Sequence, residues 1–518
     1  MKYIAALREK NPLVICLTND VVKNFTANGL LAVGASPAMS SCIEDLRDLL
    51  PHAQALLVNI GTVNPELAAF YKKAVALANE LNVPVVLDPV ACSAGPFRRN
   101  IALDLLLEHK ITLLRGNAGE IASLVQAKQE LDVANGRNFE ITQAKDITAV
   151  SSKGVDSAGV AKPGMLATQC AKAFNVLTVV TGPIDGISNG VKTIEITNGS
   201  SMMPLVVGTG CLLGGFLAAF IGSTSTSMEF NLSSDNATDE DLFSRTLWGL
   251  TAYSVAAEMA AENCKAIYRQ VEPGSFQIEF LNALYGITDD VVTNRKNWQM
   301  VFNRSQLAVY FICGTQDFKG TQNSEEAALI CIETALQAGI TMFQLREKGE
   351  DSLQGEAKLE FAKKVQTLCQ NYQVPFVMND DMALAEQLNV DGVHIGQEDD
   401  SIESVRQRFS NKIIGLSIHS PEEYSHSRVD LADYIGVGPV YGTQSKGDAK
   451  APIGPEGIQA VRNVDSEIPI VAIGGITAET TAIIRNHGAD GVSVISAITK
   501  ASNVVEVVKQ FREAIKKR

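Results

Sequence analysis

In the segment 375–399, two short apolar runs each lead into a pair of acidic residues. The pairs are Asp380 and Asp381 after Phe376–Met378, and Glu398 and Asp399 after Gly392–Ile395. If the runs are neighbouring parallel strands, their carboxyl ends meet at one edge of a sheet and bring the carboxylates together. Hard cations such as Mg²⁺ prefer oxygen ligands of this kind, usually together with substrate phosphates. Because Asp and Glu also favour helix N-termini, helix capping is the second interpretation, and the segment alone leaves both open.

The second half of the chain repeats a strand followed by a helical pattern or a short crossover. The expected strands are Leu307–Ile312, Thr341–Leu345, Phe376–Met378, Gly392–Ile395, Ile413–Leu416, Tyr434–Val437, Ile470–Ile473 and Gly491–Ile495. The helical patterns extend from 324–337 to 504–516. Eight such units in about 215 residues predict a TIM (β/α)₈ barrel, in which chemistry lies at the carboxyl ends of the strands.

Polar residues and glycines follow these strands, at the rim where the chemistry of such a barrel lies. They are Gln344–Lys348, Asn379 and Asp380, Gln397–Asp399, Ser417 and His419, Gly438 and Pro439 with Thr443–Lys446, Gly474 and Gly475, and Ile495 and Ser496. The residues after the last two strands, Gly474, Gly475 and Ser496, suit a phosphate monoester held by backbone N–H groups.

Three cations of this rim, Arg346, Lys348 and Lys446, face the acids. Beside Asp380 and Asp399, they indicate Mg²⁺ bridging a more highly charged group such as a diphosphate. Two phosphorylated substrates in one pocket imply group transfer in which pyrophosphate leaves. The metal and the cations would stabilise the charge that develops on that leaving group.

The composition excludes several classes of function. The chain has 518 residues, of which 46% are hydrophobic and 20% charged, and its net charge is −14. These values are typical of a globular protein, with a length that suits roughly two to four domains. The acidic balance and the lack of Lys/Arg-rich runs argue against nucleic acid or an anionic membrane as a partner. Nine scattered cysteines, the lack of a signal-peptide core and a glycine-interrupted apolar stretch at Pro204–Gly222 predict a reduced, cytoplasmic protein.

The first half alternates apolar runs with helical patterns, which predicts an α/β layered domain with a helical C-terminal part. Strands are expected at Leu13–Leu17, Ala55–Asn59, Val85–Leu87, Ile111–Leu114 and Leu177–Val180. Helices are expected at Pro65–Leu81, Arg98–His109, Lys162–Phe174, Gly210–Ile221, 242–263 and 274–285, with no strand after Glu240. Residues 125–150 break this alternation and are expected to form a surface insertion or flap. The domain boundary is expected in the polar stretch Thr288–Arg304.

A glycine-rich turn, Gly208-Thr209-Gly210-Cys211, opens an apolar helical pattern in the first half. Its free N–H groups and the helix dipole would attract a phosphoryl oxygen. Close packing of glycines against a sheet is the alternative interpretation. Asp88, the segment 115–120 and Thr181 also stand at carboxyl ends of expected strands, where ligands of α/β sheets bind.

Residues 305–518 resemble thiamine-phosphate synthase through the motifs Q-L-R-E-K, N-D, G-Q-E-D, G-x-S-x-H, T-Q-S-K, G-G-I and V-I-S-A-I, which occur in the family's order. The resemblance implies that the pyrimidine diphosphate is bound by Gln344, Leu345, Arg346, Glu347, Lys348, Asn379, Ser417 and Lys446, with Lys348 and Lys446 taking part in catalysis. It implies that the thiazole phosphate is bound by Thr443, Gln444, Ser445, Gly475, Ile495 and Ser496, and Mg²⁺ by Asp380 and Asp399.

The same resemblance implies a dissociative displacement, in which diphosphate departs before the thiazole nitrogen captures the pyrimidinyl cation. Asp381 and Glu398 are then expected to cap helices, and His394 and His419 to be structural. Ser445 departs mildly from the family's usual Thr or Pro but keeps a hydroxyl that can donate a hydrogen bond.

Residues 1–290 resemble hydroxyethylthiazole kinase, which has a ribokinase-like α/β/α fold. The most specific match is Thr18–Ser40, followed in family order by D-P-V, R-G-N-A-G-E, V-V-T-G and G-T-G-C-L-L. The resemblance implies that Met39 and Gly208 contact the thiazole alcohol, that Arg115 and Thr181 contact ATP, and that Asp88 and Glu120 lie near Mg²⁺-bound phosphates. Cys211 occupies the position of the catalytic base in related kinases, and a helix N-terminus would favour its thiolate. A small buried cysteine is the alternative.

Together the two resemblances imply a bifunctional enzyme of thiamine biosynthesis, with domains at 1–290 and 305–518 and a linker at 291–304. The first domain would phosphorylate 4-methyl-5-(2-hydroxyethyl)thiazole with ATP and Mg²⁺. The second would couple the product to 4-amino-2-methyl-5-hydroxymethylpyrimidine diphosphate. The alternatives are a single active half with the kinase half as an oligomerisation scaffold, and a non-catalytic sensor of phosphate ligands. A homo-oligomer, a trimer or a multiple of it, is implied by the kinase family.

Overall fold

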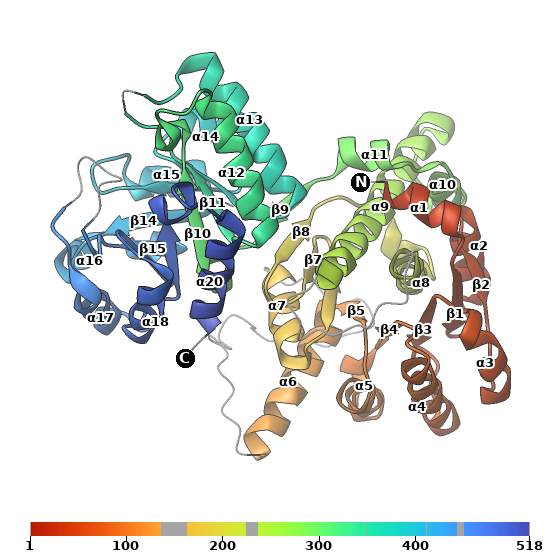
Figure 1. Cartoon of the computed structure of the whole chain (residues 1–518). Helices are drawn as coiled ribbons and strands as arrows, with labels where there is room; N and C mark the ends of the chain where they lie inside the picture. The colour runs from red at the N-terminus through yellow and green to blue at the C-terminus, as the bar shows by residue number, and fades with distance from the viewer. Residues whose placement is uncertain are drawn as a thin grey trace. The chain divides into compact units, whose positions relative to one another are not determined.

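The structure is a computed structural model that describes residues 2–135, 163–223, 237–349, 351–410, 412–442 and 450–516. The chain divides into two compact units, Met1–Val301 and Phe302–Arg518. Figure 1 shows a layered sheet in the first unit and a closed barrel in the second.

The first unit is built on a nine-stranded sheet with the order β2-β1-β3-β4-β5-β6-β7-β8-β9. Its strands are β1 Leu13–Leu17, β2 Ser36–Ala38, β3 Ala55–Asn59, β4 Val85–Asp88, β5 Leu113–Asn117, β6 Leu177–Thr181, β7 Asp185–Ser188, β8 Thr193–Ile196 and β9 Trp298–Met300. The pairs from β2 to β6 are parallel, and those from β6 to β9 are antiparallel. The carboxyl ends of β1 and β3 to β6 therefore lie along one edge of the sheet.

Helices cover both faces of this sheet (Figure 1). They are α1 Tyr3–Lys10, α2 Lys23–Val33, α3 Ile43–Leu49, α4 Pro65–Glu80, α5 Pro96–Glu108, α6 Ala118–Ala134, α7 Pro163–Phe174, α8 Thr209–Gly222, α9 Ala237–Tyr268, α10 Pro273–Gly286 and α11 Asp289–Arg295. Because successive strand residues point to opposite faces, Val14 and Cys16 pack with α2, α8, α9 and α10. Ile15 and Leu17 pack with α4 to α7 on the other face. The unit is thus an α/β/α sandwich.

Three expectations for the first half need correction. A strand does follow Glu240: β9 pairs with β8 and extends the sheet. The interval 291–304, expected to be a linker, contains the end of α11 and all of β9. The expected insertion at 125–150 begins too early, because α6 continues to Ala134 and its Val125 side chain is 1% exposed. The remainder of that segment lies outside the described residues.

The second unit is a closed barrel of eight parallel strands, as the sequence predicts. Its strands are β10 Val309–Cys313, β11 Met342–Leu345, β12 Phe376–Asn379, β13 Gly392–Ile395, β14 Ile413–Ile418, β15 Tyr434–Val437, β16 Ile470–Ile473 and β17 Gly491–Val494. Its helices are α12 Ser324–Ala338, α13 Gly355–Asn371, α14 Met382–Leu388, α15 Ile402–Arg408, α16 Pro421–His426, α17 Gly454–Val464, α18 Ala478–Asn486, α19 Ser496–Thr499 and α20 Val504–Lys516.

Two separate cores hold the barrel together. Outward-facing strand residues such as Phe343 and Phe376 pack against the helices in the larger core. Inward-facing residues, among them Tyr310, Met342 and Tyr434, fill the interior in a smaller core. The interior is therefore closed by side chains, and the carboxyl ends of the strands form the open rim.

In the described part of the chain, no helix is long and apolar enough to cross a membrane. All nine cysteines lie within the described ranges, and each is a free thiol.

Candidate active sites

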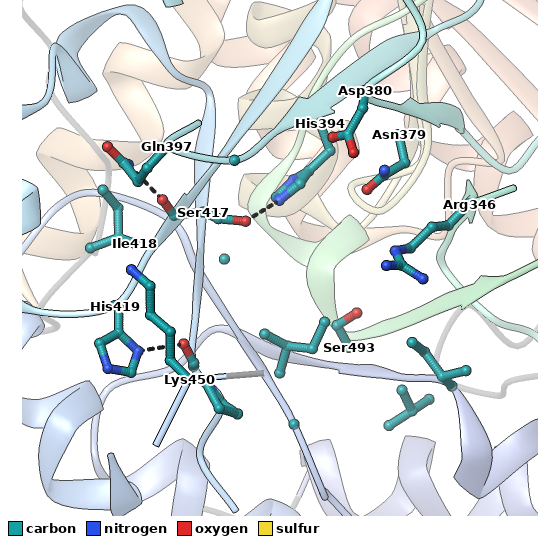
Figure 2. A pocket seen from close by; sticks show the side chains of 18 of the residues that line it. Arg346, Asn379, Asp380, His394, Gln397, Ser417, Ile418, His419, Lys450 and Ser493 are labelled. Carbon is teal, nitrogen blue, oxygen red and sulfur yellow. Dashed lines mark hydrogen bonds between the residues drawn. The ribbon is translucent and has the colours of Figure 1, made fainter. Parts of the chain in front are cut away.

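A cavity of about 340 Å³ opens at the rim formed by the carboxyl ends of the barrel strands. Figure 2 shows side chains from several strands and loops pointing into it. Nine of the residues that the sequence assigned to the two barrel substrates and the metal line this cavity. They are Arg346, Lys348, Asn379, Asp380, Asp399, Ser417, Gly475, Ile495 and Ser496.

The two acids expected to hold the metal lie together at this cavity. Burial and the adjacent carboxyl group of Asp380 raise the pKa of Asp399. Asp399 Oδ2 accepts a hydrogen bond from the backbone N–H of Gly396 at 2.7 Å, which fixes its orientation. Asp380 has a φ of +57° and donates its own N–H to the carbonyl of His394 at 3.1 Å, so two neighbouring strands hold the pair.

Lys348, in the loop that follows β11, contacts one acid of this pair. Its Nζ lies 2.8 Å from Asp380 Oδ2, and this hydrogen bond raises the pKa of the ammonium. Two adjacent carboxylates repel each other and favour a divalent cation, whose charge would offset theirs. The described residues contain no cluster of three or more His, Cys, Asp or Glu ligands. The pair Asp380 and Asp399 fits Mg²⁺, which commonly takes one or two carboxylates and completes its shell with phosphate and water.

The structure separates Asp381 from this pair. Asp381 is the N-cap of α14, and its Oδ1 accepts the backbone N–H of Leu384 at 3.0 Å. Its Oδ2 lies 2.7 Å from Nζ of Lys358. Burial opposes ionisation, but Lys358 and the capping N–H outweigh it and lower the pKa of Asp381. Asp381 thus serves a helix terminus, whereas Glu398 lines the cavity beside Asp399.

Three residues of the Q-L-R-E-K segment do not reach the cavity. Leu345 is buried in the outer core, and Gln344 is turned into the interior, where its Nε2 donates to Tyr310 Oη at 2.8 Å. The carboxylate of Glu347 accepts hydrogen bonds from Thr315 and from the N–H of Leu353, and so holds two loops together. Four further predicted residues, Thr443, Gln444, Ser445 and Lys446, lie outside the described residues.

Several cavity residues had no sequence signal that marked them as functional. His394, which was expected to be structural, lines the cavity, and its Nε2 lies 2.9 Å from Ser417 Oγ (Figure 2). Lys450 forms an ion pair with Glu423, and both line the cavity. Ser493 is 2% exposed, and its hydroxyl has no hydrogen-bond partner among the described residues. An isolated Lys, Glu or Ser is too common in a sequence to be singled out without the fold.

In the first unit, a buried ion pair joins the carboxyl ends of β4 and β5. Arg115 Nη1 lies 3.2 Å from Asp88 Oδ2, and Arg115 Nη2 donates to Thr181 Oγ1 at 3.1 Å. The side chain of Asp88 is fully buried, and Arg115 is 8% exposed. Burial lowers the pKa of Arg115, but Asp88 and Glu120 outweigh it and keep the guanidinium charged. Three residues predicted from separate motifs therefore meet in one network.

Asn59 and Asn19 connect this network to Cys211. Asn59 Nδ2 donates to Asp88 Oδ2 at 2.9 Å, and Asn19 Nδ2 donates to Asn59 Oδ1 at 3.1 Å and to Cys211 Sγ at 3.6 Å. Cys211 lies in the first turn of α8. Burial and the nearby Asp88 raise the pKa of its thiol, although Arg115 opposes the shift. The surroundings thus favour the neutral thiol, against the expectation that the helix N-terminus would favour the thiolate.

Glu120 provides a second carboxylate beside Asp88. Its Oε1 accepts the N–H of Ala91 at 2.7 Å and its Oε2 accepts the N–H of Asn117 at 2.8 Å, within a capping box that begins α6. Burial and the charge of Asp88 raise the pKa of Glu120 to about 7. The Oδ1 atom of Asp88 is buried and has no hydrogen-bond partner among the described residues. An unpartnered carboxylate oxygen beside a second acid fits a Mg²⁺–phosphate site.

The glycine-rich turn before α8 shows the close packing that the sequence allowed as one of two interpretations. Gly208 is the N-cap of α8 and has a φ of +96°. A Cβ on Gly214 would lie 2.9 Å from Leu57, so this glycine permits close packing on the sheet. A Cβ on Gly210 would lie 3.4 Å from Arg115 Nη2, so the helix begins beside the ion-pair network. Met39 is half-buried against the core on the same face as α8.

Comparisons with known proteins assign each unit. The model of the hydroxyethylthiazole kinase family matches residues 4–131 and 127–290, and the model of thiamine monophosphate synthase matches residues 309–498. Hydroxyethylthiazole kinase 1 of Streptococcus pneumoniae strain CGSP14 is 46% identical over 296 residues, which cover 57% of this chain and 99% of that protein. The hydroxyethylthiazole kinase of Streptococcus suis strain 05ZYH33 is 45% identical over 295 residues, with 57% and 97% covered.

Two solved structures are similar to one unit each. The hydroxyethylthiazole kinase protein of Pyrococcus horikoshii OT3 is 31% identical and covers 58% of this chain and 98% of its own, with a TM-score of 0.46. The thiamine phosphate pyrophosphorylase of Pyrococcus furiosus is 29% identical and covers 41% and 98%, with a TM-score of 0.36. The family models span the two halves that the sequence motifs delimit. The chain belongs to the hydroxyethylthiazole kinase family and also carries a thiamine monophosphate synthase domain, so it is a bifunctional enzyme of thiamine biosynthesis.

Proposed function

We propose that the two sites catalyse consecutive reactions. The first unit phosphorylates 4-methyl-5-(2-hydroxyethyl)thiazole with ATP. The barrel then couples the thiazole phosphate to 4-amino-2-methyl-5-hydroxymethylpyrimidine diphosphate and yields thiamine phosphate and pyrophosphate. The observation that carries the second step is the acid pair Asp380–Asp399 with Lys348, placed at the mouth of a cavity of about 340 Å³.

In the barrel, we assign different roles in diphosphate binding to the cationic and the acidic residues. Arg346, Lys348 and Asn379 line the cavity beside Asp380. There they would donate hydrogen bonds to the diphosphate oxygens. Asp380 and Asp399 would hold Mg²⁺, which would supply positive charge to offset that of the diphosphate. The charge of Lys348 would stabilise the same oxygens, which supports the dissociative displacement that the synthase resemblance implies.

The opposite part of the rim receives the thiazole phosphate. Gly475 has a φ of +62° and Ser496 begins α19, so backbone N–H groups there are available to a phosphate monoester. The predicted contribution of Thr443, Gln444, Ser445 and Lys446 belongs to the same proposal. Holding the two substrates at opposite parts of one rim brings the thiazole nitrogen towards the carbon that loses diphosphate.

In the first unit, we assign ATP binding to Arg115 and Thr181 and the thiazole alcohol to Met39 and Gly208. The Arg115 guanidinium, already held by Asp88, would stabilise charge on the transferred phosphoryl group. Asp88 and Glu120 suit the Mg²⁺ that accompanies the nucleotide. Because the Cys211 thiol is favoured, we assign Cys211 to positioning the alcohol rather than to removing its proton.

Three broader proposals accompany these assignments. The nine-stranded sheet covered on both faces supports a ribokinase-like fold for the first unit. Kinase activity is assigned to residues 1–290 and synthase activity to residues 305–518. Free thiols and phosphorylated substrates support a cytoplasmic enzyme, and the kinase family supports an assembly built from trimers.

The function is tested by omitting one component at a time from a reaction of purified protein, ATP, Mg²⁺, thiazole alcohol and pyrimidine diphosphate. The complete mixture is expected to yield thiamine phosphate, and omission of ATP is expected to abolish it. Product from pre-made thiazole phosphate but none from the alcohol would show that the kinase half is a scaffold. No product from either would favour a sensor of phosphate ligands.

A further inference from the structure

A chain of hydrogen bonds crosses the interior of the barrel and ends at the cavity. Gln344 Nε2 donates to Tyr310 Oη at 2.8 Å, and Tyr310 Oη lies 2.8 Å from Tyr434 Oη. Tyr434 Oη lies 3.0 Å from His394 Nδ1, and His394 Nε2 lies 2.9 Å from Ser417 Oγ. Five strands contribute one residue each, in the order β11, β10, β15, β13 and β14.

Burial isolates this chain from water except at one end. Gln344 is 2% exposed, Tyr310 1% and Tyr434 0%, whereas Ser417 lines the cavity (Figure 2). Burial raises the pKa of both Tyr310 and Tyr434 well above the usual range. Each tyrosine therefore keeps its one phenolic proton at neutral pH, and solvent cannot exchange partners along the interior links.

Two glycines make room for the central pair. A Cβ on Gly415 would overlap both His394 and the Tyr434 ring. A Cβ on Gly436 would lie 3.2 Å from His394 Cε1. Since both glycines lie on strands that form the barrel, the backbone itself holds the imidazole against the phenol.

The direction of the chain follows from what each group can donate. The amide nitrogen of Gln344 has only protons to offer, so the Tyr310 oxygen accepts. Within the described residues, Tyr310 has Gln344 and Tyr434 as partners, so its proton goes to the Tyr434 oxygen. The Tyr434 proton then goes to His394 Nδ1.

This order determines the last two links. A His394 that accepts at Nδ1 is neutral and carries its proton on Nε2, which donates to Ser417 Oγ. Ser417 thereby accepts from the imidazole and has its own proton left. Among the described residues, no acceptor for that proton is recorded, and the side chain lines the cavity.

We propose that the chain from Gln344 to Ser417 fixes His394 as the Nε2–H tautomer and so makes Ser417 a hydrogen-bond donor to an acceptor atom of the bound pyrimidine diphosphate. Tyr310, Tyr434 and His394 are then positioning residues, which act on the substrate through Ser417. The inference rests on the proposed synthase function for the identity of the ligand, but the tautomer itself does not depend on that function.

The tautomer is measured directly by NMR of the full chain labelled with ¹⁵N-histidine. The chain has six histidines, and the His394 signals are identified by their loss in His394→Asn. We expect the Nε2 shift to be of the protonated type and the Nδ1 shift of the unprotonated type. Protonation at Nδ1 alone, or at both nitrogens, would overturn the proposal, because the Gln344 amide would then be reversed or the imidazole charged.

A variant tests the link to substrate binding. Tyr434→Phe removes the donor to His394 Nδ1 but keeps the ring, and we expect loss of the single-tautomer signal with about a tenfold rise in KM for the pyrimidine diphosphate. The control is Tyr372→Phe, which also removes a hydrogen-bonded hydroxyl, 2.9 Å from Gln337 Nε2 on the barrel exterior. Equal KM values for the two variants would overturn the proposal.

The two failures are distinguishable. If wild-type protein makes no thiamine phosphate from pre-made thiazole phosphate, the synthase function fails, whatever the tautomer. If synthesis is normal and His394 carries its proton on Nδ1, only the present inference fails. Inhibition by inorganic pyrophosphate shows which part of the substrate accepts the Ser417 hydrogen bond. If pyrophosphate inhibits Tyr434→Phe more weakly than wild type, the acceptor lies on the diphosphate. If it inhibits both equally, the acceptor lies on the pyrimidine.

Discussion

The guanidinium of Arg115 lies 3.2 Å from the carboxylate of Asp88, and both side chains are buried at the carboxyl edge of the first unit's sheet. A buried pair of this kind costs desolvation on both sides and is weak evidence for stability by itself. Its position beside Thr181 and the start of α8 is the basis for our proposal that Arg115 provides a preorganised charge for phosphoryl transfer.

Replacing Arg115 by Lys should separate charge from geometry. Lys keeps a cation beside Asp88 but cannot contact Asp88 and Thr181 at the same time. We expect the kcat/KM of the kinase to fall by about 10- to 100-fold, and coupling from pre-made thiazole phosphate to stay unchanged. Arg295→Lys, in an exposed pair with Glu262 at 2.9 Å, is the matched control. Equal kinase activity of both variants would remove Arg115 from the site.

Asp185 should make the stability of the first unit depend on pH. Burial raises the pKa of this carboxyl group from 3.8 to about 6, although Gly182 and Arg115 oppose the shift. Because the folded state holds the proton more tightly, this contribution to the free energy of unfolding is present below pH 3.8 and is lost as pH rises through about 6. The loss amounts to about 3 kcal/mol.

Asp185→Asn should therefore lose less free energy of unfolding than wild type as the pH rises from 3.8 to about 6. Both tryptophans, Trp248 and Trp298, lie in the first unit, so denaturant unfolding followed by tryptophan fluorescence reports this unit. Asp20→Asn, at a side chain that is 85% exposed, is the control. A wild-type profile that Asp185→Asn leaves unaltered would contradict the buried-charge account.

Asp380→Asn should disable one unit and spare the other. The amide cannot supply the second negative charge of the acid pair, so we expect a loss of roughly 100-fold in the coupling rate. The kinase reaction, measured as thiazole phosphate formed from ATP, should be unchanged. Asp351→Asn, which removes an exposed acid 2.5 Å from Lys319, is the control. Loss of both activities in Asp380→Asn would mean that the units depend on each other.

Asp381 and Asp399 should differ in their response to Mg²⁺. Asp381→Ala removes the N-cap of α14 and should lower the free energy of unfolding by about 1 kcal/mol. It should leave the Mg²⁺ concentration for half-maximal coupling unchanged. Asp399→Ala should raise that concentration, because one of the two carboxylate ligands is removed. The same Mg²⁺ requirement in both variants would contradict the assignment of the metal to Asp399.

These acids also show what the sequence could and could not predict. The eight barrel strands were predictable because each is an apolar run followed by rim residues, most of them polar. The count of eight predicted a closed barrel, and the barrel places Asp380 and Asp399 at the same rim. Asp381 could be assigned as a cap only by resemblance, since metal ligands and N-caps use the same carboxylate.

Other features required the fold. The strands β2, β7, β8 and β9 were missed, and β9 joins the sheet beside β8, about 100 residues earlier in the chain. The chain from Gln344 to Ser417 links residues up to 124 positions apart within one step, which no local pattern encodes. The raised pKa of Cys211 depends on burial and on Asp88, which lie outside the helix that suggested a thiolate.

The most direct test of the bifunctional account follows one phosphorus atom through both sites. Protein is given ATP labelled with radioactive phosphorus at the γ-phosphate, together with thiazole alcohol, pyrimidine diphosphate and Mg²⁺. The account predicts label in thiamine phosphate, one atom per molecule formed, and none in the released pyrophosphate. Unlabelled thiamine phosphate, or labelled thiazole phosphate that is never converted to thiamine phosphate, would contradict it.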